Sequence, residues 1–139
     1  MKVKDIMTDS VVSVSPGETV AVAARTLAQY NIGILPVCRG GKLCGLVTDR
    51  DLVTRCLAAN RAPNKTTVEQ IMTADIRSVR PDTDLGAAAH LMGTQQVRRL
   101  PVVEDGVLRG MVSLGDLARR EDSLMDAADA LMDISHNLR

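Results

Sequence analysis

Both halves of this chain show the same pattern of apolar residues. In each half, apolar residues first recur at helical intervals and then form short continuous runs. Residues 20–30 and 85–95 carry apolar and alanine residues three and four positions apart, which predicts an Ala-rich helix in each half. The dipeptides Gly40-Gly41 and Asp105-Gly106 suit two-residue hairpin turns, whose central residues both take a positive φ. Each dipeptide separates two apolar runs that predict paired strands: 34–38 with 42–48, and 100–104 with 107–113.

Shorter segments complete the pattern around each predicted helix and hairpin. Thr19 and Asp84 stand where a side-chain oxygen can cap the start of the Ala-rich helix. A further helix is predicted to begin near Asp49 in the first half and near Gly115 in the second. A turn of helix and then an extended segment are predicted before each cap, at 3–7 and 11–14 and again at 68–72 and 76–79. Each half is therefore expected to be a β-α-β-β-α unit.

The two halves are copies of one unit. When the chain is shifted against itself by 65 residues without a gap, about a third of positions 3–55 meet an identical residue. This repeat predicts an α+β fold (an α/β-type repeat) whose two units pack sheet to sheet about a pseudo-twofold axis, because one copy is marginal alone. The expected boundaries are 1–59 for the first repeat, 60–67 for a linker, 68–121 for the second repeat and 122–139 for an amphipathic C-terminal helix.

Three motifs recur in order in both copies and resemble the cystathionine-β-synthase (CBS) domain. In the first copy they read Val3-Lys4-Asp5-Ile6-Met7-Thr8, Leu35-Pro36-Val37 and Gly45-Leu46-Val47-Thr48-Asp49-Arg50-Asp51-Leu52. The second copy repeats them from Val68, Leu100 and Gly110. The resemblance covers residues 3 to about 121 and implies a tandem pair, or Bateman module. Such pairs commonly bind AMP, ATP or S-adenosylmethionine, regulate another protein and form dimers.

A hydroxyl and a carboxylate three residues apart lie where the last strand of each copy meets its helix. Backbone N–H groups at a helix start favour an anion, and the carboxylate can accept hydrogen bonds from two ribose hydroxyls. The same pair is also an ordinary helix-capping arrangement. Both interpretations stay open from the residues alone for Thr48 with Asp51 and for Ser113 with Asp116.

The resemblance implies two unequal ligand sites, each combining this motif from one copy with the start of the first hairpin strand in the other. In the favoured site an arginine grips phosphate and Val97 lines the base pocket. The mirror site has no basic residue at the matching positions. The favoured site comprises Thr48, Arg50, Asp51, Val97, Arg98 and Arg99, and the mirror site comprises Ile32, Gly33, Ile34, Ser113 and Asp116.

Composition and charge disfavour several classes of function. Lys and Arg number 17, as do Asp and Glu, so no basic excess favours a nucleic-acid or membrane partner. The three cysteines have no paired spacing and no signal peptide is expected, which together favour the cytosol. No metal-ligand spacing is present, so no metal site is expected. No catalytic triad or phosphate-binding loop is present, so an enzyme is not expected.

The predicted function is a regulatory module that binds an adenine nucleotide between its repeats and controls a partner protein. AMP or ATP is preferred over S-adenosylmethionine and NAD, since the arginine pair favours phosphate, and no cofactor is required. The first alternative is a ligand-free dimeric scaffold with vestigial clefts. A second alternative is a redox-sensitive module using Cys38 and Cys44, which are expected on paired strands beside a tight turn.

Overall fold

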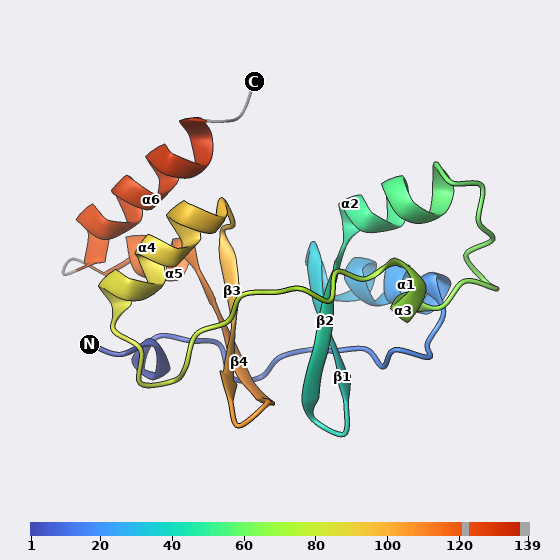
Figure 1. Ribbon diagram of the computed structural model, residues 1–139, viewed down its shortest axis with the longest axis horizontal. Coiled ribbons are helices and arrows are strands. Elements are labelled where there is room, and N and C mark those ends of the chain that lie inside the picture. The colour runs from blue at the N-terminus through green and yellow to red at the C-terminus, as the bar shows by residue number, and fades with distance from the viewer. Residues whose placement is uncertain (121–122, 137–139) are drawn as a thin grey trace. The chain divides into compact units, whose positions relative to one another are not determined.

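The computed structural model describes residues 1–120 and 123–136 and divides into two compact units (Figure 1). We name them by their hairpins. The β1–β2 unit comprises Val12–Ile76, and the β3–β4 unit comprises Met1–Val11 together with Arg77–Arg139. None of the described helices has the length and apolar character needed to cross a bilayer.

The β1–β2 unit contains one hairpin with helices on either side of it in sequence. Its elements are α1 (Val20–Tyr30), β1 (Ile34–Arg39), β2 (Lys42–Thr48), α2 (Asp49–Asp51), the π-helical segment η2 (Leu52–Leu57) and α3 (Val68–Ile71). Aliphatic side chains from these elements form one core, including the fully buried Leu35, Val37 and Val47.

The β3–β4 unit repeats this plan and adds a long helix at its C-terminal end. Its elements are the 3₁₀ turn η1 (Val3–Asp5), α4 (Leu85–Gln95), β3 (Arg99–Glu104), β4 (Val107–Ser113), α5 (Leu114–Ala118) and α6 (Leu124–His136). Helix α6 runs beside α4 and also contacts α5 (Figure 1). The α+β fold class is confirmed. The sheet-to-sheet packing of the repeats stays a prediction.

Local sequence signals set most of these boundaries correctly. Both Ala-rich helices begin and end where the spacing predicts, and both hairpin turns carry the expected positive φ, with 59° and 82° at Gly40 and Gly41. Thr19 caps α1 by accepting a hydrogen bond from the backbone N–H of Val22 at 3.2 Å. Asp84 occupies the N-cap position of α4 but makes no capping bond. It accepts instead from the Lys2 ammonium group at 2.7 Å.

The extended segments before the Ala-rich helices pair less than a strand would. Val14 forms a single parallel bridge to Val37, and Val79 forms the equivalent bridge to Val102. In each bridge the segment makes two backbone hydrogen bonds, of 2.8 to 3.0 Å, with the residues on either side of Val37 or Val102. The first predicted strand of each repeat is thus reduced to one paired position.

The first segment of each sequence repeat packs in the unit that holds the other repeat's hairpin. Thr8 forms an antiparallel bridge with Met111, and Thr73 forms the matching bridge with Leu46. A glycine precedes each bridged hairpin residue and makes the approach possible, because a Cβ on Gly110 would lie 2.6 Å from the Thr8 carbonyl oxygen. The repeating unit in sequence and the compact unit in space are therefore different sets of residues.

The C-terminal helix predicted at 122–139 is described in part. Helix α6 spans Leu124–His136, and Asp122, Leu138 and Arg139 lie outside the described residues. Its predicted amphipathic character is present, because Ala127, Ala130 and Ile134 are buried in the core of the β3–β4 unit. The acidic residues Asp126, Asp129 and Asp133 are exposed.

Candidate functional site

The hydroxyl–carboxylate motif forms a reciprocal capping box in the β1–β2 unit. The Thr48 hydroxyl oxygen accepts from the Asp51 backbone N–H at 3.1 Å, and Asp51 Oδ2 accepts from the Thr48 N–H at 2.9 Å. These bonds satisfy two donors that a helix start otherwise leaves unpaired. The side chains are therefore fixed in orientation by backbone groups before any ligand arrives.

The β3–β4 unit builds the same box at the same place. Ser113 Oγ accepts from the Asp116 N–H at 3.1 Å, and Asp116 Oδ2 accepts from the Ser113 N–H at 2.9 Å. The capping interpretation of the motif is thus observed in both units. It leaves the second oxygen, Oδ1, of each carboxylate for other partners.

The Oδ1 atoms of Asp51 and Asp116, which the boxes do not use, differ in how closely a neighbouring arginine approaches them. Asp116 Oδ1 lies 2.6 Å from Arg119 Nη2, which is a short charge-assisted hydrogen bond. Asp51 Oδ1 lies 3.6 Å from Arg55 Nε, beyond ordinary hydrogen-bond length. Arg55 instead directs Nη1 to the Ile71 carbonyl at 3.0 Å. Asp51 therefore has the more available acceptor.

The sequence interpretation missed both of these arginines. Arg119 follows Asp116 by three residues and Arg55 follows Asp51 by four. Those are the spacings at which opposite charges meet on a helix, so the signal was present in the sequence.

Within each unit, the start of the first hairpin strand lies against the helix start of the same hairpin. The Gly33 carbonyl accepts from the Asp49 N–H at 3.0 Å, and Ile34 stands opposite Thr48 in the hairpin register. A Cβ on Gly33 would lie 3.3 Å from Asp49 Oδ2, so that exposed carboxylate would have to shift slightly to admit a side chain there.

The equivalent positions of the β3–β4 unit are basic. The Arg98 carbonyl accepts from the Leu114 N–H at 2.8 Å, and Arg99 stands opposite Ser113. Arg98, Arg99 and Arg119 are exposed, and Arg119 bonds to Asp116 in the first turn of α5. In the β3–β4 unit, the structure thus places Arg98 and Arg99 beside Ser113 and Asp116. In the β1–β2 unit, the residues at the start of the hairpin lie beside those of the box: Ile32, Gly33 and Ile34 with Thr48, Arg50 and Asp51. The favoured and mirror sites implied by the family resemblance each combine residues of both units, and these two sites stay a prediction.

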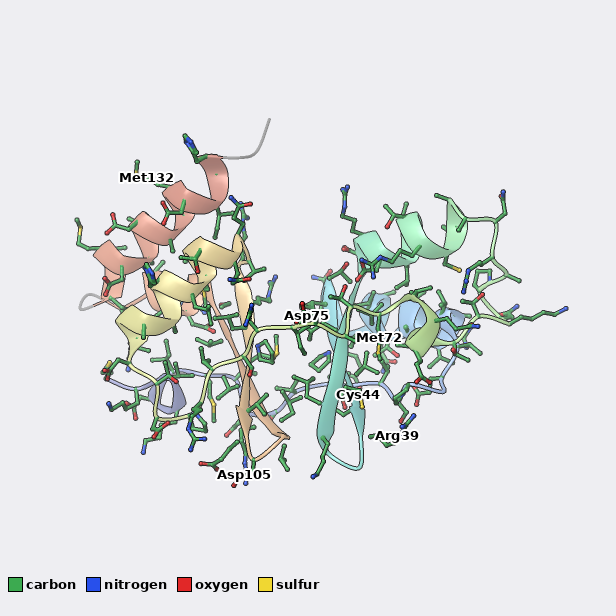
Figure 2. All side chains as sticks on the ribbon, in the orientation of Figure 1. Arg39, Cys44, Met72, Asp75, Asp105 and Met132 are labelled. Carbon is green, nitrogen blue, oxygen red and sulfur yellow. The ribbon has the colours of Figure 1, made fainter. Side chains whose placement is uncertain are left out.

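The cysteine pair lies at an irregularity of the first hairpin. Cys38 stands opposite Leu43 while Val37 stands opposite Gly45, so Cys44 is the extra residue of a β-bulge. Figure 2 shows Cys44 on this hairpin. Burial raises the pKa of the Cys38 thiol, the nearby Cys44 raises it further and a hydrogen bond with Ser13 opposes them. All three cysteines are free thiols.

The described residues contain no cluster of three or more His, Cys, Asp or Glu side chains able to hold a metal ion. The structure of Hypoxic Response Protein I, by contrast, contains two coordinated zinc ions. It is 35% identical to this chain, covers 86% of it and 98% of its own length, and superposes with a TM-score of 0.79.

Comparison with known proteins identifies the family. The CBS domain model matches residues 3–58 and again 68–123. The CBS domain-containing protein YhcV of Bacillus subtilis is 42% identical over 134 residues, which cover 96% of this chain and 95% of YhcV.

Two related structures contain adenosine-type ligands. CBSX2 in complex with AMP is 32% identical, covers 85% of this chain and 93% of its own, and gives a TM-score of 0.75. The CBS domain pair of MJ0100, in complex with 5-methylthioadenosine and S-adenosyl-L-methionine, is 30% identical, covers 86% and 94%, and gives the same TM-score. With two matches of the family model and the repeated motifs of both hairpins, this chain belongs to the CBS domain family, as a tandem CBS pair.

Proposed function

We propose that this CBS pair is a regulatory module that binds an adenine nucleotide and thereby controls a partner protein. The observation that carries the proposal is the pair of pre-formed boxes at Thr48–Asp51 and Ser113–Asp116, each with its carboxylate held by one backbone N–H group. A carboxylate fixed in this way accepts ribose hydroxyls without a further loss of side-chain entropy. Related CBS pairs whose structures contain AMP or S-adenosylmethionine support the ligand class.

The charges favour a ligand that carries phosphate. Arg98 and Arg99 are exposed, and their planar guanidinium groups suit bidentate contacts with phosphate oxygens. In the favoured site, Asp51 supplies the ribose acceptor because its Oδ1 atom is not firmly held by Arg55. Arg50 adds a further phosphate donor, and Val97, which is 36% exposed, contributes an apolar wall for the base. AMP and ATP are therefore proposed ahead of S-adenosylmethionine and NAD.

The mirror site is proposed as the weaker one. Ile32, Gly33 and Ile34 offer no positive charge there, and Asp116 Oδ1 is already bonded to Arg119. A ligand would have to displace that 2.6 Å bond before the carboxylate could accept a ribose hydroxyl. Regulation follows if the bound nucleotide favours one arrangement of the chain over another, since a ligand shifts populations only by its differential affinity.

The test is thermal unfolding with AMP, ADP, ATP, NAD, S-adenosylmethionine and adenosine. A ligand at 100 times its dissociation constant stabilises the protein by about 2.7 kcal/mol, which raises Tm by several degrees. Asp51→Asn keeps a similar shape and should abolish the shift, as should Arg99→Ala. Asp9→Asn, an exposed aspartate outside both sites, is the control and should leave it unchanged.

The outcome decides between the proposal and its alternatives. A shift that persists in Asp51→Asn would move the site elsewhere. No shift with any of the six compounds would leave a ligand-free dimeric scaffold, and a Tm that responds only to oxidant would favour the thiols of Cys38 and Cys44 as the sensor.

A further inference from the structure

Helix α6 is an addition to the CBS pair, because it lies beyond the second match of the family model. That match ends at residue 123, and α6 spans Leu124–His136. The inner side of α6 is occupied, since Ala127, Ala130 and Ile134 are buried in the core of the β3–β4 unit and the helix contacts α4 and α5. What the rest of α6 presents to solvent is therefore not set by the CBS fold itself.

A second side of α6 is apolar and is not covered by the described residues. It carries four large side chains that remain exposed: Leu124 at 49%, Met125 at 75%, Leu131 at 42% and Met132 at 71%. We call these four residues the α6 stripe. The first two recur seven residues later as the last two, which is two helical turns and the spacing at which one helix meets another. Figure 2 shows Met132 projecting from α6 on the side away from α4.

More of the large exposed apolar residues lie on α6 than on any other described element. Ten such side chains are exposed in the described part of the chain, and four of them lie in the 13 residues of α6. Two of the four are methionines, whose flexible thioether side chains adapt to the shape of a partner. Single exposed apolar residues are ordinary, whereas a contiguous set of them is typical of a surface that another molecule covers.

Charge indicates which kind of partner suits the α6 stripe. Helix α6 carries three exposed aspartates, Asp126, Asp129 and Asp133, and no Lys or Arg. Asp129 follows Met125 by four residues and precedes Met132 by three, which places it at the border of the stripe. A helix packed on the stripe therefore brings its flanking residues toward a carboxylate, where Lys or Arg is favoured. A second α6 would bring aspartates toward aspartates and is disfavoured.

We propose that the α6 stripe is the docking surface for an amphipathic helix of a partner protein, one with Lys or Arg beside its apolar side. The proposal rests on the proposed function, in that a regulatory module needs a partner, and it names the chemistry of that partner. The apolar residues of the partner helix pack on the stripe, and a cationic residue reaches Asp129. The stripe covers on the order of a few hundred Å², against ~800 Å² per partner in a stable complex, so the contact is transient.

The test is fluorescence anisotropy of two labelled synthetic helical peptides, measured without nucleotide. Both peptides carry leucine at heptad positions a and d, and one has lysine at the flanking positions where the other has glutamate. The lysine peptide should bind the wild type, and the glutamate peptide should bind at least about tenfold more weakly because it brings like charge to the aspartates of α6. Asp129→Asn keeps a similar shape and should weaken binding of the lysine peptide about two- to fivefold. Asp9→Asn, an exposed aspartate outside α6, is the control and should not change it.

Two double variants test the stripe itself. Met125→Gln with Met132→Gln removes two exposed apolar side chains without adding charge, and should weaken binding of the lysine peptide at least about tenfold. Val53→Gln with Leu57→Gln replaces two apolar residues of η2 that are 55% and 58% exposed, and should leave the binding unchanged. Should the methionine variant unfold at a lower temperature than the wild type, Asp129→Asn and the comparison of the two peptides still decide.

Several results would overturn the proposal. Binding of neither peptide, equal binding of both, or an equal loss in the η2 variant would each show that the stripe does not select a basic helix. A dimer that becomes a monomer in the methionine variant, seen by sedimentation velocity, would mean that a second copy covers the stripe. Cosedimentation with phosphatidylcholine vesicles that is lost in the same variant would make the occupant a membrane. Because nucleotide is left out, a failure here leaves the proposed nucleotide site standing, and the thermal unfolding test decides that site separately.

Discussion

Replacing Gly110 by alanine should destabilise the β3–β4 unit by displacing the N-terminal segment that crosses β4. The new Cβ would lie 2.6 Å from the Thr8 carbonyl oxygen and 2.9 Å from the Met7 sulfur. The methionine side chain can rotate away, but the carbonyl is backbone. The segment must therefore move as a whole or accept the contact.

The size of the loss follows from what that movement breaks. Thr8 and Met111 exchange two backbone hydrogen bonds, of 2.8 and 2.9 Å. Each contributes about 1 kcal/mol net, and overpacking a fitted contact costs about 1–3 kcal/mol. The chain either loses the bonds or retains the compression, so we expect the free energy of unfolding to fall by about 1–3 kcal/mol.

The assay is urea unfolding followed by circular dichroism, with Gly17→Ala as the matched control. A Cβ on Gly17 would meet nothing within 4 Å, and its backbone φ is not positive. Both substitutions reduce the entropy of the unfolded chain alike, so their difference isolates the steric effect. A difference below about 1 kcal/mol would refute the reasoning, because it would mean that the segment moves at little cost.

Three other results should follow. The pKa of Asp84 is lowered by its hydrogen bond with Lys2 and by the attraction between the two charges. The stability that Asp84 adds is therefore present above its unfolded-state pKa and is lost as the pH falls through its folded-state pKa. The Tm difference between wild type and Asp84→Asn should accordingly vanish in acid. Burial raises the pKa of Cys38, so iodoacetamide should alkylate this thiol more slowly at neutral pH in native protein than in urea. Peptide mass spectrometry would measure the two rates, and equal rates would contradict the prediction. Thr48→Ala removes a cap and should lower the free energy of unfolding by about 1 kcal/mol in urea titrations, and a neutral result would mean that Asp51 alone holds the helix start.

Local signals in the sequence were sufficient for the helices and hairpins. Gly40-Gly41 fixed the turn because both positions need a positive φ, and the spacing of apolar residues set the bounds of α1 and α4. The shift of 65 residues carried each signal to the second copy. These features depend on residues close in the chain, which is why a sequence alone can specify them.

Contacts between residues that are distant in sequence could not be predicted from local spacing. Asp84 was predicted as a helix cap, but Lys2 lies 82 positions away in sequence and takes its carboxylate at 2.7 Å. The candidate site shows the same division. Its hydroxyls and carboxylates were found from their spacing, whereas the unequal hold of Arg55 and Arg119 on the free oxygens depends on side-chain geometry.

The sequence by itself determined the repeat, the family and the residues from which a ligand site is built, because these are written in the order and spacing of residues. The tertiary structure decided which copies of a repeated segment pack together. Met7 and Met72 lie in matching Val-x-x-Ile-Met-Thr motifs, yet each contacts a glycine in the hairpin of the other repeat, Gly110 or Gly45. The repeated motif by itself does not distinguish the two choices, since each repeat contains one such segment and one such glycine. Chain connectivity and packing make that choice, and they also place α6 against α4 and α5 of the β3–β4 unit.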